Sequence, residues 1–165
     1  KGVNMALSTI GTNSIADDAV TAAKATGFGK IAQVVTVEKA PAENSTSGTS
    51  FVTPSGASIN ITPSATTSKV LVMVQGGGTA VPDGGNAQFT IYRGSTNLGN
   101  SSYGFQRQYN DERSDQPLSM QVLDTPNSTS QQTYAIYYKS ASSSNVYMHQ
   151  TVSGVITLIA MEILA

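Results

Sequence analysis

The fold is decided by the stretch Gly154-Val-Ile-Thr-Leu-Ile-Ala-Met-Glu-Ile-Leu-Ala165, an apolar run in which Glu162 is the one charged residue. The run is shorter than the roughly 18 to 20 apolar residues that a membrane-spanning helix needs. Its length does not separate helix from strand, but its many β-branched residues favour a strand. The stretch therefore predicts a buried β-strand.

Counting by two along this strand gives two faces, and both are mostly apolar. A strand on the surface of an ordinary antiparallel sheet alternates apolar and polar residues, because one of its faces meets water. We therefore expect one face to pack in the protein's own core and the other against a neighbouring subunit. Two-sided burial indicates an oligomer without fixing its symmetry. The candidate subunit interface comprises Ile156, Leu158, Ala160 and Leu164.

The composition is poor in charge and rich in small polar residues. Of the 165 residues, 39% are hydrophobic and 12% are charged, whereas roughly 25% are charged in average globular proteins. A polar but uncharged surface is typical of secreted β-rich adhesive proteins and of virus particles. The net charge of -1 gives no electrostatic basis for binding nucleic acid, and no basic run indicates a membrane surface. The lack of cysteine excludes disulfides and thiolate metal sites.

Residues 30–165 are expected to form one globular domain built from strands. Apolar segments recur between turn signals such as Pro82-Asp-Gly-Gly85. Within residues 57–62, for example, Ile59 and Ile61 are predicted to face inward and the residues between them outward. About eight to ten antiparallel strands are expected. The predicted fold class is all-β, a β-sandwich whose form at this chain length is a jelly roll.

Residues 1–29 differ from the rest because they are small and polar. Ser14 and Asp17 resemble a helix capping box with aspartate in place of glutamate. We expect a short stalk, extended or helical, that orders against partners, because a helix of this length is marginal alone. The alternative is a leader without fixed structure. The candidate attachment residues are Ile10, Ile15 and Val20.

The sequence offers no constellation for catalysis. His149 is the one histidine, and no cysteine or adjacent carboxylate could complete a metal site or a catalytic triad with it. Gly76-Gly-Gly78 lacks the lysine and hydroxyl residue of a phosphate-binding loop. We therefore predict no catalytic, metal-binding or cofactor-binding residues, and a protein that is not an enzyme.

Residues 103–115 concentrate charge and aromatic rings in a chain that is otherwise poor in charge. Aromatic and arginine side chains dominate binding hot spots, and together with carboxylates they suit sugar recognition. One alternative is that these charges pair with each other, or across subunits, to order a long loop. A glycosidase site would need a carboxylate pair whose separation the sequence does not fix. The candidate receptor-contact residues are Tyr103, Phe105, Arg107, Tyr109, Asp111, Glu112 and Arg113.

Several segments resemble a family of bacteriophage virion proteins that form the tips of tail fibres or head fibres. The resemblance lies in strand patterns such as Ser58-Ile-Asn-Ile-Thr-Pro-Ser64, Phe89-Thr-Ile-Tyr-Arg-Gly94 and Ile156-Thr-Leu-Ile-Ala-Met-Glu-Ile163. Ile15-Ala-Asp-Asp-Ala-Val-Thr-Ala-Ala-Lys24 is also similar to the Asp-Asp-Ala-Val-Thr-Thr-Ala-Lys units that precede such tips. These motifs are structural and carry no chemistry.

The resemblance implies a homotrimeric jelly-roll head on the exterior of a phage particle. Residues 1–29 would attach it to other virion proteins, and its exposed loops would contact a glycan or protein of the host surface. Fibres often carry several copies of the leader unit, whereas this chain has one. A capsid decoration (cement) protein that reinforces the shell is therefore the alternative, and a carbohydrate-binding or depolymerase module is a third possibility.

Overall fold

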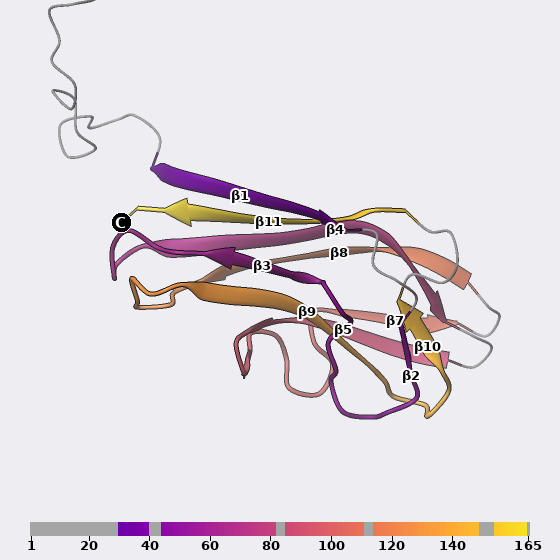
Figure 1. Cartoon of the computed structure of the whole chain (residues 1–165). Coiled ribbons are helices and arrows are strands. Elements are labelled where there is room, and N and C mark those ends of the chain that lie inside the picture. The colour runs from indigo at the N-terminus through magenta and orange to yellow at the C-terminus, as the bar shows by residue number, and fades with distance from the viewer. Residues whose placement is uncertain (1–29, 40–43, 82–84, 111–113, 149–153, 165) are drawn as a thin grey trace, which may run out of the picture.

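The computed structural model describes residues 30–39, 44–81, 85–110, 114–148 and 154–164. Within these ranges the chain forms eleven strands and no helix. The strands make two antiparallel sheets that pack face to face, as Figure 1 shows. The all-β prediction is therefore confirmed.

Sheet A holds the first and last strands of the domain as neighbours. Its main strands, in spatial order, are β1 (Ile31–Lys39), β11 (Ile156–Ile163), β4 (Lys69–Val81) and β8 (Ser114–Asp124). The distal half of β4 also pairs with β10 (Val146–Met148), which in turn pairs with β2 (Asn44–Thr46). β11 therefore lies between two strands that come from the start and the middle of the chain.

Sheet B covers one face of sheet A. Its main strands, in spatial order, are β3 (Ser58–Ile61), β9 (Gln132–Ser140), β5 (Gly85–Arg93) and β7 (Gln106–Asn110). The short β6 (Thr96–Asn97) pairs with β5 on the same side as β7.

The strand order is that of a jelly roll. Without the three shortest strands, β2, β6 and β10, eight strands remain. Numbered along the chain, they run 1-8-3-6 across sheet A and 2-7-4-5 across sheet B. Eight antiparallel strands shared in this way between two sheets form two Greek keys. The predicted jelly roll is confirmed, with the three short strands as additions.

The core lies between the two sheets and is formed mainly by alternate residues of β3, β4, β5, β8, β9, β10 and β11. Sheet B contributes its largest side chains, among which Phe89 and Tyr138 stack with ring centres 6.4 Å apart. As predicted, Ile59 and Ile61 face inward, with exposed fractions of 1% and 2%. The buried apolar residues of sheet A are Val70, Val72, Val74, Leu118, Met120, Val146, Met148, Ile156, Leu158 and Ala160.

The position of β11 corrects the predicted subunit interface. Ile156, Leu158 and Ala160 are at most 1% exposed because they point into the protein's own core. They are therefore unavailable to another subunit in this fold, and that part of the prediction is wrong. Leu164 lies beyond the end of β11 and is partly exposed. Both faces of the strand are apolar, so the period of two could not tell which face is covered by sheet B.

Glu162 is buried at the end of β11 and ties three segments together. Its carboxylate accepts hydrogen bonds from Gln33 Nε2 (2.6 Å), the Ser64 backbone N–H (2.7 Å) and the Ser64 hydroxyl (2.6 Å). Burial alone would raise the pKa of this carboxyl group. The hydrogen bonds from Gln33 and Ser64 outweigh burial and lower the pKa to about 2. Glu162 therefore joins β11 to β1 and to the connection between β3 and β4.

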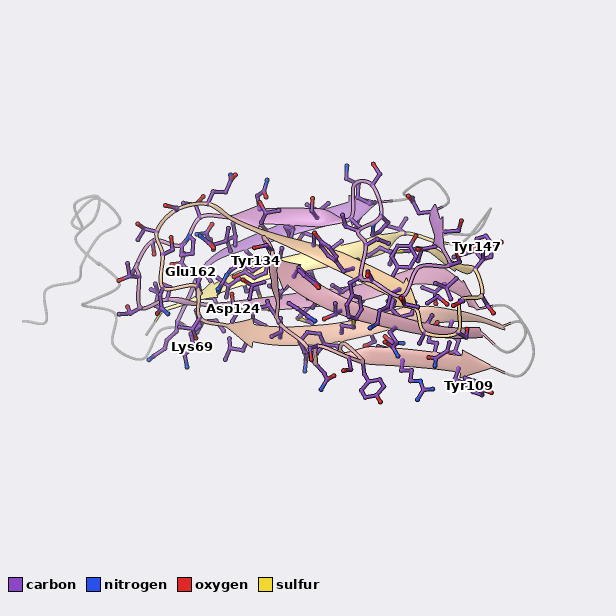
Figure 2. All side chains as sticks on the ribbon, turned by 90° about the horizontal axis from the view of Figure 1, so that it is seen from below. Lys69, Tyr109, Asp124, Tyr134, Tyr147 and Glu162 are labelled. Atoms are coloured by element: carbon purple, nitrogen blue, oxygen red, sulfur yellow. The ribbon has the colours of Figure 1, made fainter. Side chains whose placement is uncertain are left out.

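Both ends of the domain lie at the same end of the sandwich. The backbone N–H of Leu164 donates to the carbonyl of Lys30 at 2.7 Å. Figure 1 shows the C-terminus beside the start of β1. In Figure 2, Glu162, Asp124 and Lys69 lie at this end, whereas Tyr109 and Tyr147 lie at the opposite end.

Gly76 allows β4 and β11 to approach closely, and Gly56 provides a matched control. Both have positive φ, so alanine at either costs about 1–2 kcal/mol of backbone strain. Only at Gly76 would the added Cβ also lie 2.5 Å from the Val155 carbonyl oxygen; at Gly56 it meets nothing within 4 Å. We expect Gly76→Ala to lower the free energy of unfolding, measured in urea, by clearly more than Gly56→Ala. Equal losses would contradict the close approach.

The lowered pKa of Glu162 predicts how the stability of the protein depends on pH. Its pKa falls from 4.5 to about 2 on folding, so its stabilisation is complete above pH 4.5 and is lost as the pH falls towards 2. The shift corresponds to about 3 kcal/mol. In urea unfolding from pH 7 to 2, we expect Glu162→Gln to be less stable at pH 7 and to lack this acid loss. Glu38→Gln, at an exposed position of β1, should keep the wild-type profile. Identical profiles for Glu162→Gln and the wild type would refute this role.

Candidate interaction surfaces

The outer face of sheet A, which points away from sheet B, is apolar at its centre. From β1 to β8, one row across it is Val34, Met161, Leu71 and Leu123, and the next is Thr36, Ile159, Met73 and Gln121. Val34 is 55% exposed and Leu123 is 52% exposed. The residues of β11 and β4 between them are partly exposed. Contiguous exposed apolar surface is a feature of many protein interaction sites.

Charged residues lie at the margins of the outer face of sheet A. Lys69 is exposed at one end, where it pairs with Ile163 of β11. Glu38 is exposed at the other end, where it pairs with Thr157. Between these two positions, the described rows carry no charge. Many protein–protein interfaces likewise have an apolar centre and a polar margin.

Four predicted receptor-contact residues are described, and the structure gathers them along one edge of sheet B. Tyr103, Phe105, Arg107 and Tyr109 are all exposed, in β7 and the turn before it. The Arg107 guanidinium carbon lies 5.8 Å from the centre of the Tyr109 ring, and its Nε donates to Asn86 Oδ1 at 2.9 Å. Figure 2 shows Tyr109 at the end of the sandwich opposite to Glu162. These four residues can therefore be reached by a large partner.

The other predicted residues cannot be placed. The candidate receptor-contact residues Asp111, Glu112 and Arg113, the single histidine His149, and the candidate attachment residues Ile10, Ile15 and Val20 lie outside the described residues.

A second aromatic group, on the outer face of sheet B, was not singled out from the sequence. Tyr92 of β5 and Tyr137 of β9 stack with ring centres 3.9 Å apart and planes at 23°. The Phe51 ring meets Tyr92 edge-on at 6.2 Å, and Lys139 Nζ lies 4.5 Å from the centre of the Phe51 ring. Alternation along β9 places Tyr138 inward and so signals that Tyr137 points outward. The contact between Phe51 and Tyr92 depends on the fold, and no local sequence pattern predicts it.

The charges of Arg93 and Asp124 are used within the fold. Arg93 Nη1 and the Tyr134 hydroxyl both donate to Asp124 Oδ2, at 2.6 and 2.7 Å. This cluster links β5 and β9 of sheet B to β8 of sheet A. Burial, followed by the hydrogen bond to Asp124, raises the pKa of Tyr134, so its hydroxyl stays protonated and continues to donate. These contacts hold the two sheets together, and the charged groups in the cluster are already paired with each other.

Among the described residues, no three histidine, cysteine, aspartate or glutamate side chains gather as a metal site would require. In the same part of the chain, no helix has the length and apolar character needed to span a bilayer.

Comparison with known proteins gives little more than a loose likeness in fold. Neither a protein-family model nor a curated protein matches the sequence. The VP2 subviral particle of infectious bursal disease virus aligns with a TM-score of 0.39 and 14% identity, and the Gt strain of that virus with 0.33 and 18%. Each alignment covers 81% of this chain but 38% of the viral chain, so this chain spans well under half of those proteins. The fold assignment therefore rests on the strand pairing.

Proposed function

We propose that the protein is a non-enzymatic structural component of a virus particle, and that residues 30–165 assemble as a homotrimeric head. The observation that carries this proposal is the apolar outer face of sheet A. Sheet B covers the other face of sheet A, so another chain is the natural cover for this one. The trimeric symmetry and the virion setting rest on the resemblance to phage fibre tips.

The placement of the chain ends supports an attached and outward-pointing head. Residues 1–29 precede Lys30, which lies at the same end as Leu164. A head held there by other virion proteins would direct its opposite end, with Tyr109, away from the particle. This geometry suits the tip of a tail fibre or head fibre on the exterior of a phage, in contact with a glycan or protein of the host surface.

Burial of the outer face of sheet A would supply the energy of assembly. Removing apolar surface from water is worth roughly 25 cal/mol per Å². Partly exposed side chains such as Leu71 and Met161 would lose their remaining contact with water. A single glutamate placed in this surface would have to be buried without a partner, which is costly.

Two substitutions of the same kind test the interface. Val34 is 55% exposed on the outer face of sheet A, and Val52 is 40% exposed beside β9 of sheet B. By light scattering coupled to gel filtration, we expect the wild type and Val52→Glu to have the mass of three 17.1 kDa chains. Val34→Glu should give folded protein with the mass of one chain. A trimer that survives Val34→Glu, or a monomeric wild type, would refute the proposed interface.

The place on the particle needs a separate experiment. Gold-labelled full-length protein, added to particles that lack it, should appear in electron micrographs at the ends of fibres. Label spread evenly over the shell would instead establish the capsid decoration role, for which the single leader unit leaves room. Failure to bind particles at all would contradict both forms of the proposal.

A further inference from the structure

A hollow of about 300 Å³ lies on the outer face of sheet B. One wall of the hollow is formed by residues that follow Val52, beside the edge of β9. Val52 pairs with Tyr138 and Ser58 pairs with Ala135, and residues 53–57 make a turn between these two points of contact. The opposite wall is the turn at Gly94, whose N–H donates to the Thr133 carbonyl at 2.9 Å. The volume is at the lower limit of small-molecule sites and suits one sugar ring.

Tyr137 is the aromatic residue among those that line the hollow. The ring is held in place because it stacks on Tyr92 at 3.9 Å, and Phe51 supports Tyr92 from the side. A rigid aromatic ring that is already oriented loses little freedom when a ligand packs on it. The C–H groups on one face of a pyranose ring form an apolar surface that matches such a wall.

The remaining walls are rich in hydroxyl groups. Thr53, Ser55, Ser58 and Thr133 line the hollow together with backbone atoms. A hydroxyl group can donate and accept, as the hydroxyls of a sugar do. Thr53 Oγ1 already donates to the Pro54 carbonyl at 3.3 Å, so its oxygen is available to accept. Thr133 Oγ1 already donates to Asn60 Oδ1 at 2.7 Å, so its oxygen is oriented to accept. One apolar wall and several hydroxyl groups form a surface that is complementary to a carbohydrate.

No charged residue lines the hollow, but the same outward face of sheet B carries cations further along its strands. Lys139 lies two residues from Tyr137 on the same face of β9, and Gln88 separates it from Arg107 in one row across sheet B. The Lys139 ammonium group is held over the Phe51 ring. Among the described residues that face outward from sheet B, none is a carboxylate. This field favours a ligand with negative charge.

We propose that this hollow binds one unit of an acidic polysaccharide, with the sugar ring on Tyr137 and the carboxylate of the sugar towards Lys139. This proposal rests on the proposed function, in which the protein contacts the host surface. It adds the class of host-surface glycan and a binding site that is separate from Tyr103 and Tyr109. The hollow itself is formed by one chain, so binding does not depend on the trimer.

Native gel electrophoresis of the full-length protein, through gels that contain polygalacturonate or neutral dextran, tests the proposal. We expect polygalacturonate to slow the wild type at concentrations at least tenfold below those needed with dextran. Tyr137→Ala removes the wall, and Ser58→Trp fills the hollow while the stacked tyrosines stay in place. Each should weaken retardation by polygalacturonate about tenfold or more, which is the effect expected when a buried anchor is lost.

Two further variants complete the design. Lys139→Gln should bring retardation by polygalacturonate down to the level of dextran, because it removes the cation and leaves the hollow. Tyr147→Ala is the matched control, since Tyr147 lies in β10 of sheet A. It should behave as the wild type. Thermal unfolding and light scattering of every variant verify that the fold and the oligomer are unchanged.

Four results would overturn the proposal, and three of them concern the wild type and the hollow variants. They are binding that Tyr137→Ala and Ser58→Trp both leave intact, equal retardation by the two polymers, and no retardation by either. Loss of binding in Tyr109→Ala with full binding in Tyr137→Ala would also overturn it, by moving the glycan to the edge of β7. Failure of the proposed assembly would appear instead as a monomer in light scattering, with binding to the hollow retained.

Discussion

Sheet A is apolar on both faces, whereas sheet B can cover only one of them. This imbalance governs the rest of the structure. The inner face is satisfied by the core, where residues such as Leu158 and Val72 are almost completely removed from water. The outer face presents Leu71, Met73 and Ile159 in adjacent positions with no second layer in the described chain. Hydrophobic burial is the dominant favourable term in folding and association, so this surface has a free-energy reason to be covered.

Glu162 is a charged residue in an otherwise apolar strand, and its hydrogen bonds explain how it can be buried there. The carboxylate is fully buried and accepts three short hydrogen bonds from Gln33 and Ser64. A buried charge is tolerated when such bonds replace those it made to water. Glu162 lies two residues before Leu164, whose N–H donates to the Lys30 carbonyl, so this buried charge is at the end of the sandwich that holds both of these residues.

The general architecture could be predicted from local patterns. Alternation at Ile59 and Ile61 and the β-branched run at 155–163 are enough to identify strands, and their number and spacing indicate a jelly roll. The face of β11 that meets sheet B could not be predicted, because both faces are apolar and the pattern is symmetric. Glu162 lies on the same face of β11 as Leu158. Only the pairing of β11 with β1 reveals that Gln33 lies beside Glu162 and bonds its carboxylate, so that this face can be buried.

The surfaces were predictable in part. Local density of aromatic and charged residues identified Tyr103, Phe105, Arg107 and Tyr109, which the structure places together on an exposed edge. The hollow on sheet B was missed because its walls come from β9, from the turn at Gly94 and from residues 53–58. These segments are distant in sequence and meet only through strand pairing. No window of the sequence contains more than one wall.

Oxidation of methionine tests the central claim, that the outer face of sheet A is covered by other chains. Met73 and Met161 lie on that face, whereas Met120 and Met148 are in the core. Native protein would be treated with hydrogen peroxide, and the rate at each methionine read by mass spectrometry. If the face is covered, Met73 and Met161 oxidise as slowly as Met120 and Met148. If they oxidise at the rate measured for the same residues in urea-unfolded protein, the face is open to water and the claim is contradicted.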